Sequence, residues 1–230
     1  MKYIVLLILV FCGGMASAQF RPAPTPVIWT GDELFGLSVG SAYITPALSA
    51  DAFDVHQSLP IAASLHYAGE KAVGTHWVVG HQAEFNYLRS RIHYTLDGRQ
   101  TTSANNWLRH DVSSWSTCVD VRLLAGYYIT EQVSPFVSVG LYENLLVGGS
   151  STVTPVDKTS GQEGTPQSSA SKPSFGFEAG FSAAAGVNYY LNDNFYTTAT
   201  ARVHVPFGWA EERHGPVYSL TVGIGYKFIK

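Results

Sequence analysis

The feature that most limits the fold of this chain is an alternation of apolar and polar side chains with a period of two residues. In the segment TATARVHVPFGW, residues 198–209, Ala, Val and Phe occupy the odd positions from 199 to 207, while Thr, Arg and His occupy the even positions from 198 to 204. A period of two is that of a β-strand with two different faces. A polar face turned outward would indicate a secreted, soluble sandwich or barrel, and an apolar face turned outward would indicate a lipid bilayer.

Eight alternating segments follow one another, with no helical periodicity of any length between them. They span residues 34–45, 58–68, 76–94, 112–129, 135–148, 174–191, 194–207 and 217–229. Short turns such as 191–194 alternate with long polar connections, of which the Ser/Thr/Gly/Pro tract 149–173 is expected to be mobile. Short periplasmic turns and longer extracellular loops are typical of an outer-membrane barrel and not of a Greek-key sandwich. We therefore predict an all-β fold, an eight-stranded antiparallel up-and-down transmembrane β-barrel.

The composition of the two faces indicates which one is outside. Charged residues make up only 13 % of the chain, about half of the usual share in soluble domains. The polar faces consist mainly of Gly, Ser, Thr and Ala with one or two charges per strand, which suits a narrow barrel interior better than a solvent-exposed coat. The apolar faces are almost uninterrupted, and a Lys or Arg there would cost about 2–4 kcal/mol at the bilayer midplane. The apolar face is therefore predicted to contact lipid.

Aromatic residues gather near the ends of the predicted strands, where they would form two interfacial girdles. The expected girdle residues are Trp77, Tyr127, Tyr189, Phe195, Tyr226 and Phe228 near the turns, and Trp115, Phe207, Trp209 and Tyr218 near the loops. Two residues do not fit the pattern, because strict alternation puts His81 and Glu143 on the lipid face. Either a β-bulge shifts their register, or Glu143 lies near the outer rim.

The N-terminal sequence predicts export. Residues 1–18 combine Lys2, a short apolar run and the Ala16–Ala18 cleavage pattern of a signal peptide, and the apolar run is too short for a spanning helix. Residues 19–33 form a short N-terminal segment and residues 34–230 the barrel domain, which we expect in the cell outer membrane. The mature chain keeps one cysteine, Cys118, so no intramolecular disulfide is expected. The net charge of −3 argues against a nucleic-acid partner.

The candidate functional site is the lumen of the predicted barrel. Inward positions carry His66, Glu84, Asn86, Asp120, Arg122, Glu178, Arg202 and His204. Unpaired charges would be costly in such an interior, so we expect the carboxylates Glu84, Asp120 and Glu178 to pair with Arg122 and Arg202 in a network that plugs the barrel, with His204 beside it. The alternative is a narrow water or proton path that this network gates.

The local motifs resemble those of small eight-stranded outer-membrane barrels of the OmpA/OmpX type, and more narrowly the outer membrane protein beta-barrel domain family that includes PorT-like proteins. The resemblance covers residues 34–230. It rests on three motifs, GYYITEQVSPFVSVGL (126–141), GVNYYLNDNF (186–195) and TVGIGYKF (221–228). The last motif is similar to the C-terminal signal read by the barrel-assembly machinery, although Ile229 and Lys230 follow its final aromatic residue. The motifs imply the architecture and leave the function open.

The leading functional hypothesis is a monomeric barrel with a structural, envelope-integrity or surface-interaction role. Its partners would be outer-membrane lipid and lipopolysaccharide, together with surface proteins that contact the loops 97–111 and 149–173. The PorT-like resemblance implies a second possibility, a membrane component of a protein-secretion apparatus that uses turns such as 68–75. A soluble ligand-binding barrel is a further alternative.

A lipid A-modifying enzyme is the remaining alternative, and we expect no catalytic activity. The closely spaced His and Ser of outer-membrane deacylases are absent at His204, which Val205 and Pro206 follow. His93, His110 and His214 lie near loops, with Ser90, Ser113 and Ser114 nearby, but scattered serines and histidines are common. The histidines are dispersed and Cys118 has no partner at ligand spacing, so neither a metal nor a cofactor is expected.

Overall fold

The chain folds into a closed antiparallel barrel. The computed structural model describes residues 31–46, 52–97, 105–207 and 214–229, and these contain eight strands. The strands are β1 (Asp32–Pro46), β2 (Phe53–Val73), β3 (Trp77–Asp97), β4 (Asn106–Tyr127), β5 (Val133–Asp157), β6 (Gln167–Tyr190), β7 (Phe195–Pro206) and β8 (His214–Ile229). Each strand pairs with the next, and β1 pairs with β8 to close the ring. The predicted fold class is confirmed.

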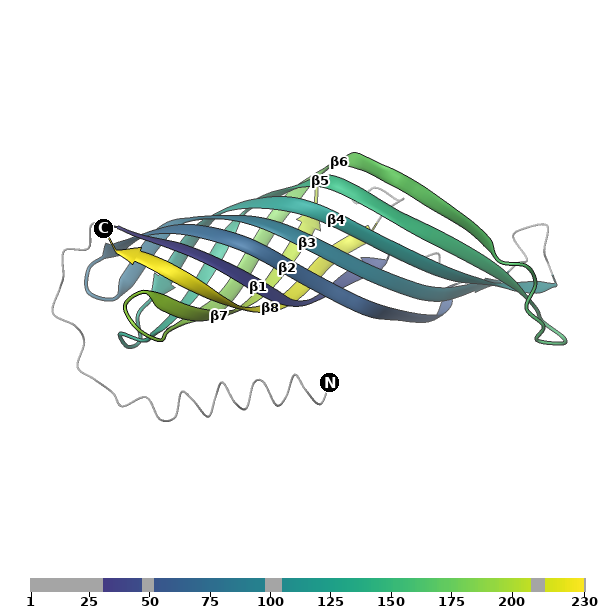
Figure 1. Ribbon diagram of the computed structural model, residues 1–230, viewed down its shortest axis with the longest axis horizontal. Coiled ribbons are helices and arrows are strands. Elements are labelled where there is room, and N and C mark those ends of the chain that lie inside the picture. The colour runs from purple at the N-terminus through teal and green to yellow at the C-terminus, as the bar shows by residue number, and fades with distance from the viewer. Residues whose placement is uncertain (1–30, 47–51, 98–104, 208–213, 230) are drawn as a thin grey trace.

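The turns at one end of the barrel are short because their residues satisfy the backbone locally. Gly74 takes a left-handed conformation with φ of 72° in the turn between β2 and β3. Asn192 accepts hydrogen bonds from the backbone N–H groups of Asn194 and Phe195 in the turn between β6 and β7. The C-terminal end of β8 lies at this same end of the molecule (Figure 1). In an outer-membrane barrel this is the periplasmic end.

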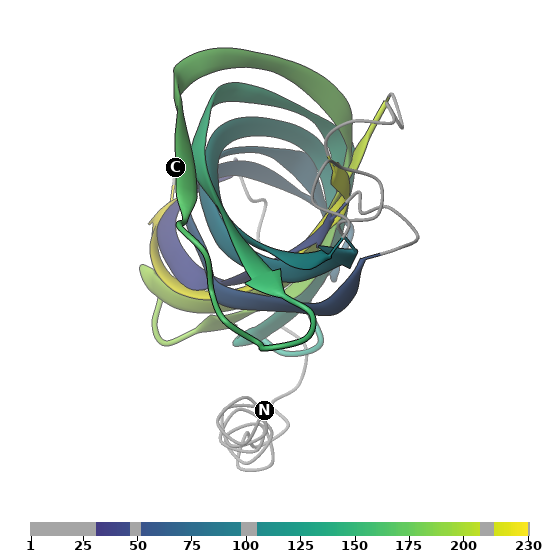
Figure 2. The same ribbon diagram turned by 90° about the vertical axis from the view of Figure 1, so that its right-hand side faces the viewer.

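At the opposite end of the barrel, the strands differ in length. Strands β2 to β6 contain 21–25 residues each, whereas β7 contains 12 and β1 and β8 contain 15 and 16. The longer strands project beyond the ring as a curved sheet, which ends in the tip between β5 and β6 (Figures 1 and 2). We call this part the outer extension; on β4 to β6 it comprises residues 106–114, 149–157 and 167–173. The outer extension therefore includes parts of the predicted loops 97–111 and 149–173.

The expectation that residues 149–173 form a connection outside the strands is therefore wrong for 149–157 and 167–173, which belong to β5 and β6. Residues 149–153 pair with 171–167, and residues 149–157 also pair with 114–106 of β4. The Thr and Val residues of this stretch favour extended structure, because β-branched residues fit a pleated sheet. The predicted connections 97–111 and 45–57 are also too long, since β4 begins at Asn106 and β2 at Phe53. The predicted turn 68–75 reduces to residues 74–76.

The two faces of the barrel differ as the sequence predicts. Side chains on the outward face are large and apolar, and Leu123, Phe175 and Val139 are each more than 60 % exposed. The inward face buries serines, threonines, asparagines and charged groups together with small residues. Glycine makes room at one crowded position, where a Cβ on Gly225 would lie 2.2 Å from the ring of Tyr196. In the described part of the chain, no helix is long and apolar enough to cross a membrane.

Candidate functional sites in the lumen and at the outer rim

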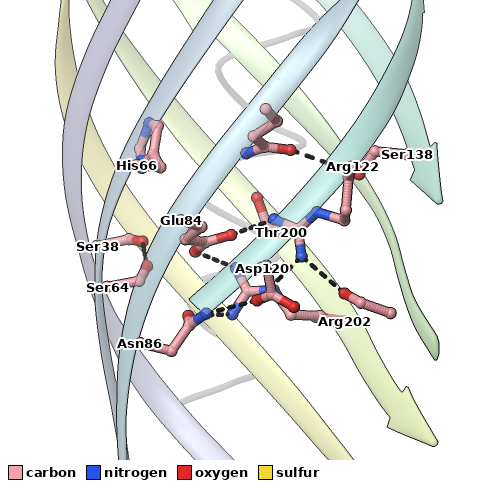
Figure 3. A network of polar contacts seen from close by, with 12 residues as sticks. Ser38, Ser64, His66, Glu84, Asn86, Asp120, Arg122, Ser138, Thr200 and Arg202 are labelled. Atoms are coloured by element: carbon pink, nitrogen blue, oxygen red, sulfur yellow. Dashed lines mark hydrogen bonds and ion pairs between the residues drawn. The ribbon is translucent and has the colours of Figure 1, made fainter. Parts of the chain in front are cut away.

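A polar network occupies the middle of the lumen (Figure 3). At its centre the buried carboxylate of Glu84, on β3, forms ion pairs with Arg122 on β4 and with Arg202 on β7. The two guanidinium groups bind different oxygens of Glu84, so that the carboxylate bridges them. Because β7 lies on the far side of the ring from β3, the pair with Arg202 crosses the interior. The sequence analysis predicted that Glu84 would pair with these two arginines, and the structure shows both ion pairs.

A second carboxylate completes the network. Asp120 accepts hydrogen bonds from His204 Nε2 at 3.0 Å and from the amide nitrogen of Asn86, and its Oδ2 lies 3.5 Å from Arg122 Nη1. Arg202 Nη1 donates to Asn86 Oδ1 at 2.8 Å. Two carboxylates thus balance two guanidinium groups, as buried charges require. The remaining predicted member, Glu178, accepts a hydrogen bond from Tyr142.

The barrel also buries polar groups close to its periplasmic end, and of these the sequence analysis missed Asp32. Lys227 Nζ lies 2.7 Å from Asp32 Oδ2, and its ammonium group lies over the ring of Tyr190. Higher in the lumen, His66 Nε2 hydrogen-bonds with the hydroxyl of Tyr196 at 2.7 Å. The predicted boundary at residue 34 leaves Asp32 outside the barrel, whereas β1 begins at Asp32. The signal for it was available, because the alternation of inward positions extends through Leu34 to residue 32.

Three residues with metal-ligating side chains meet in the lumen, although their spacing in the sequence did not suggest it. The donor atoms of Cys118, Asp120 and His204 lie within 4.8 Å of one another, and all three residues are buried. In this structure Asp120 and His204 bind each other, and Cys118 packs among small and apolar residues at the core. The cluster therefore has a structural explanation. The fold thus gives Cys118 two ligand-type neighbours that its sequence spacing did not indicate.

A different constellation lies on the outward face at the outer rim. Ser58 on β2, His93 on β3 and Asp111 on β4 form a chain of contacts: Ser58 Oγ is 3.0 Å from His93 Nε2, and His93 Nδ1 is 3.1 Å from Asp111 Oδ1. Asp111 Oδ1 also accepts a hydrogen bond from Arg91 Nε at 2.8 Å. The sequence singled out His93 with Ser90, Ser113 and Ser114, and missed Ser58. No sequence spacing could reveal it, because the three residues come from three strands.

Of the aromatic residues predicted for the girdles, those on described strands point outward or lie half-exposed. Trp77 packs edge-on against Tyr127, Phe195 against Tyr226, and Phe207 against Phe181. The remaining predicted members with described side chains are Trp115, Tyr189, Tyr218 and Phe228, and Trp209 lies outside the described residues. On β3 the outward residues Trp77 and Tyr87 bracket residues 77–87, which matches the 9–11 residues of a tilted membrane-spanning strand.

The two exceptions to the alternation both face outward. His81 lies over Gly69, where a Cβ would come within 2.6 Å of the imidazole, and its ring contacts that of Tyr67. Glu143 is exposed and precedes the register shift between Asn144 and Leu146. The bulge therefore comes after Glu143 and does not turn it inward. A register shift therefore turns neither His81 nor Glu143 toward the lumen.

A closed ring of strands with an apolar outer wall and a polar, charge-balanced interior defines a membrane-spanning β-barrel. The chain belongs to the outer membrane protein beta-barrel domain family, whose family model matches residues 5–228. The protein is therefore an outer-membrane barrel of Gram-negative type. No curated protein matches the sequence.

Several solved structures are similar to this chain at low sequence identity. Ail, the attachment invasion locus protein of Yersinia pestis, solved in complex with the heparin analogue sucrose octasulfate, is 16 % identical over 86 % of this chain and 99 % of its own, with a TM-score of 0.42. OprG from Pseudomonas aeruginosa is 10 % identical over 88 % and 98 %, with a TM-score of 0.42. Neisserial surface protein A is 14 % identical over 86 % and 97 %, with a TM-score of 0.33.

Proposed function

We propose that this protein is a monomeric outer-membrane barrel that serves the envelope and its surface, and that its lumen is closed to solutes. The network of Glu84, Asp120, Arg122 and Arg202 is the observation that carries the proposal. It joins opposite walls of the barrel at mid-height, and its ion pairs fix long side chains across the interior. Eight strands enclose just enough space for side chains. A solute would have to break buried ion pairs to pass.

The outer extension supports the surface role. Its strands are rich in Ser and Thr, and its tip is held by ion pairs between Arg109 and Glu163 and between Lys158 and Asp97. Lys158 also lies over the ring of Trp107. A hydrogen-bonded sheet of this kind suits contact with a macromolecule or with lipopolysaccharide sugars. The aromatic girdles would contact the membrane interfaces, and the strand ends at β8 would contact the barrel-assembly machinery during insertion.

Solute flux through the folded protein tests the closed lumen. We expect liposomes that contain the wild-type barrel to resist swelling in a small sugar such as arabinose, as protein-free liposomes do. The double variant Glu84→Ala/Arg202→Ala removes the central cross-lumen pair, and we expect it to raise the flux of protons or small ions. Size-dependent sugar uptake by the wild type would contradict the closed lumen. Co-isolation with a secretion complex from cells would favour the secretion alternative over a self-contained envelope role.

A further inference from the structure

We propose that Ser58, His93 and Asp111 form a hydrolytic site on the outward face of the barrel, which cleaves fatty-acyl esters of the outer leaflet. The contacts follow the order that nucleophilic catalysis needs. His93 uses Nε2 for the serine and Nδ1 for the carboxylate, at 3.0 and 3.1 Å. With the Nδ1 proton held by Asp111, the Nε2 lone pair is directed at the hydroxyl of Ser58.

The ladder explains why the three side chains meet on one face. His93 pairs with Asp111 across β3 and β4, and Ser58 pairs with Arg91, two residues before His93 on β3. Two-residue periodicity puts residues 91 and 93 on the same face. Ile92, between them, is buried and faces the other way. The imidazole of His93 is 25 % exposed, and the carboxylate of Asp111 is 32 % exposed, so a substrate can reach the site.

Arg91 adds a positive charge beside the serine. Its Nε holds Asp111 at 2.8 Å, and a guanidinium group has further N–H donors. These donors are suited to stabilising the oxyanion that develops when a serine attacks an ester. A positive charge at the outer rim also favours a substrate with a phosphate-bearing headgroup.

A crevice lined by both apolar and polar side chains borders the site. The ladder between β1 and β2 ends at Gly40 and Ala62, and beyond it Gln57 bridges the gap by donating to the carbonyl oxygen of Ala42. A cavity of about 370 Å³ lies there, within the range of about 300–1,000 Å³ for ligand pockets. Val55 and Pro60 are apolar residues of its lining, Ser41, His56 and Gln57 are polar ones, and Ala42, Ile44 and Ile92 line it from the inward side of the sheet. The His56 ring stacks on His93 at 5.1 Å, so the cavity and the triad adjoin.

The height of the site in the membrane indicates the substrate. Residues 77–87 of β3 match a membrane-spanning length, and His93 lies six residues beyond Tyr87 on the same strand. The triad is therefore outside the hydrocarbon core, at the level of headgroups. A lipid in the outer leaflet could extend one acyl chain into the crevice and present its ester to Ser58. Phospholipids and lipopolysaccharide both contain such esters.

The reaction balances with water as the only co-reactant. Ser58 Oγ bonds to the ester carbonyl carbon while its proton passes to His93 Nε2. The intermediate then breaks its bond to the alcohol oxygen, which takes the proton from Nε2 and leaves as the alcohol, so that the acyl group remains on Ser58. Water attacks this acyl carbon and gives a proton to Nε2. The Ser58 oxygen leaves with that proton, and a carboxylic acid is released.

Two assays on the folded protein test the proposal. Barrels that show the mobility shift of a folded barrel on unboiled gels are reconstituted into vesicles of phosphatidylethanolamine or of lipopolysaccharide, and released fatty acid is measured by mass spectrometry. A fluorophosphonate probe, which labels activated serines, is applied in parallel. We expect fatty acid from one of the two lipids and a label on Ser58. The lipid that is cleaved identifies the source of the ester.

Matched variants assign the roles. We expect Ser58→Ala and His93→Gln to lower fatty-acid release at least 100-fold, whereas Ser113→Ala, which removes an outward-facing serine on β4, leaves it unchanged. Asp111 is a positioning residue, so Asp111→Asn should lower kcat without raising KM, and Asp111→Glu should restore part of kcat. Folded wild-type protein that releases no fatty acid from either lipid and takes no label on Ser58 would overturn the proposal, as would full activity in Ser58→Ala.

Discussion

At the residue scale, Glu84 illustrates how the lumen is held together. Its carboxylate joins Arg122, 38 residues away in sequence, and Arg202, 118 residues away. Each charge alone would be costly to bury, and removing one partner leaves the other uncompensated. The network therefore contributes to the specificity of the closed ring, because a slipped register in any of these strands would turn a charge toward lipid.

Removing Arg202 tests this view of the network. We expect Arg202→Ala to lower the free energy of unfolding by about 3 kcal/mol, at the lower end of the range for a broken buried ion pair, because Glu84 keeps Arg122. The measurement is the urea midpoint of the barrel in detergent micelles. Arg89→Ala, which removes an exposed outward arginine, serves as the control and should leave the midpoint unchanged. Adding Glu84→Gln to Arg202→Ala should recover part of the loss, and an unaltered midpoint in Arg202→Ala would contradict the network.

The sequence predicted which charges enter the lumen but not all of their contacts. Alternation alone places Glu84, Asp120, Arg122 and Arg202 on inward faces. Which pairs form depends on the register of strands that are far apart in the chain, and single-strand patterns carry no information on that register. Ser58 was missed for the same reason, because its contact with His93, and that of His93 with Asp111, form only when three strands are aligned.

At the element scale, the outer extension explains why the predicted strands were too short. The alternation that marks a strand comes from one face in lipid and the other in the lumen. Beyond the membrane both faces of the sheet meet water, so Ser and Thr occupy both faces and the period disappears. The strands continue because their backbones remain paired, as between residues 149–153 and 167–171. The amino-acid composition at such positions is therefore like that of a loop, although the backbone forms a sheet.

The tip between β5 and β6 depends on Asp157. Its carboxylate accepts hydrogen bonds from the backbone N–H and hydroxyl of Ser160 and from the backbone N–H of Thr159. These donors, led by the backbone N–H of Ser160, hold the pKa of Asp157 below its usual value. A depressed folded-state pKa contributes stability above the unfolded pKa and loses it as pH falls through the folded pKa. The turn should therefore persist in mildly acidic solution and loosen only below the ordinary pKa of an aspartate.

Proteolysis at neutral pH checks this role. We expect Asp157→Ala to raise the rate of trypsin cleavage after Lys158 several-fold, because three hydrogen bonds that close the turn are lost, while the barrel itself stays folded. Thr159→Ala is the matched control, since it keeps the backbone donor of residue 159 and should be cleaved at the wild-type rate. Equal cleavage of the Asp157→Ala variant and the wild type would show that the carboxylate does not hold the tip.

At the scale of the whole molecule, the protein is arranged inversely to a soluble one, with charges inside and large apolar side chains outside. Val121 illustrates the outer wall. It is 60 % exposed, and its neighbours across β3 and β5 are Ala83 and Leu141. Ala83 lies near the middle of residues 77–87, so Val121 is near the bilayer midplane.

A charge at this position distinguishes a lipid-facing wall from a water-facing one. We expect Val121→Arg to destabilise the inserted barrel by about 2–4 kcal/mol, because the guanidinium would lie in hydrocarbon. In an outer-membrane fraction analysed on a denaturing gel, the wild type should migrate faster unboiled than boiled, and the variant should lose much of the fast-migrating band. Ser150→Arg puts the same side chain on an exposed position of the outer extension and should keep that band. If Val121→Arg and Ser150→Arg behaved alike, the apolar face would not be in lipid, and the protein would have to be a soluble barrel with its pocket inside.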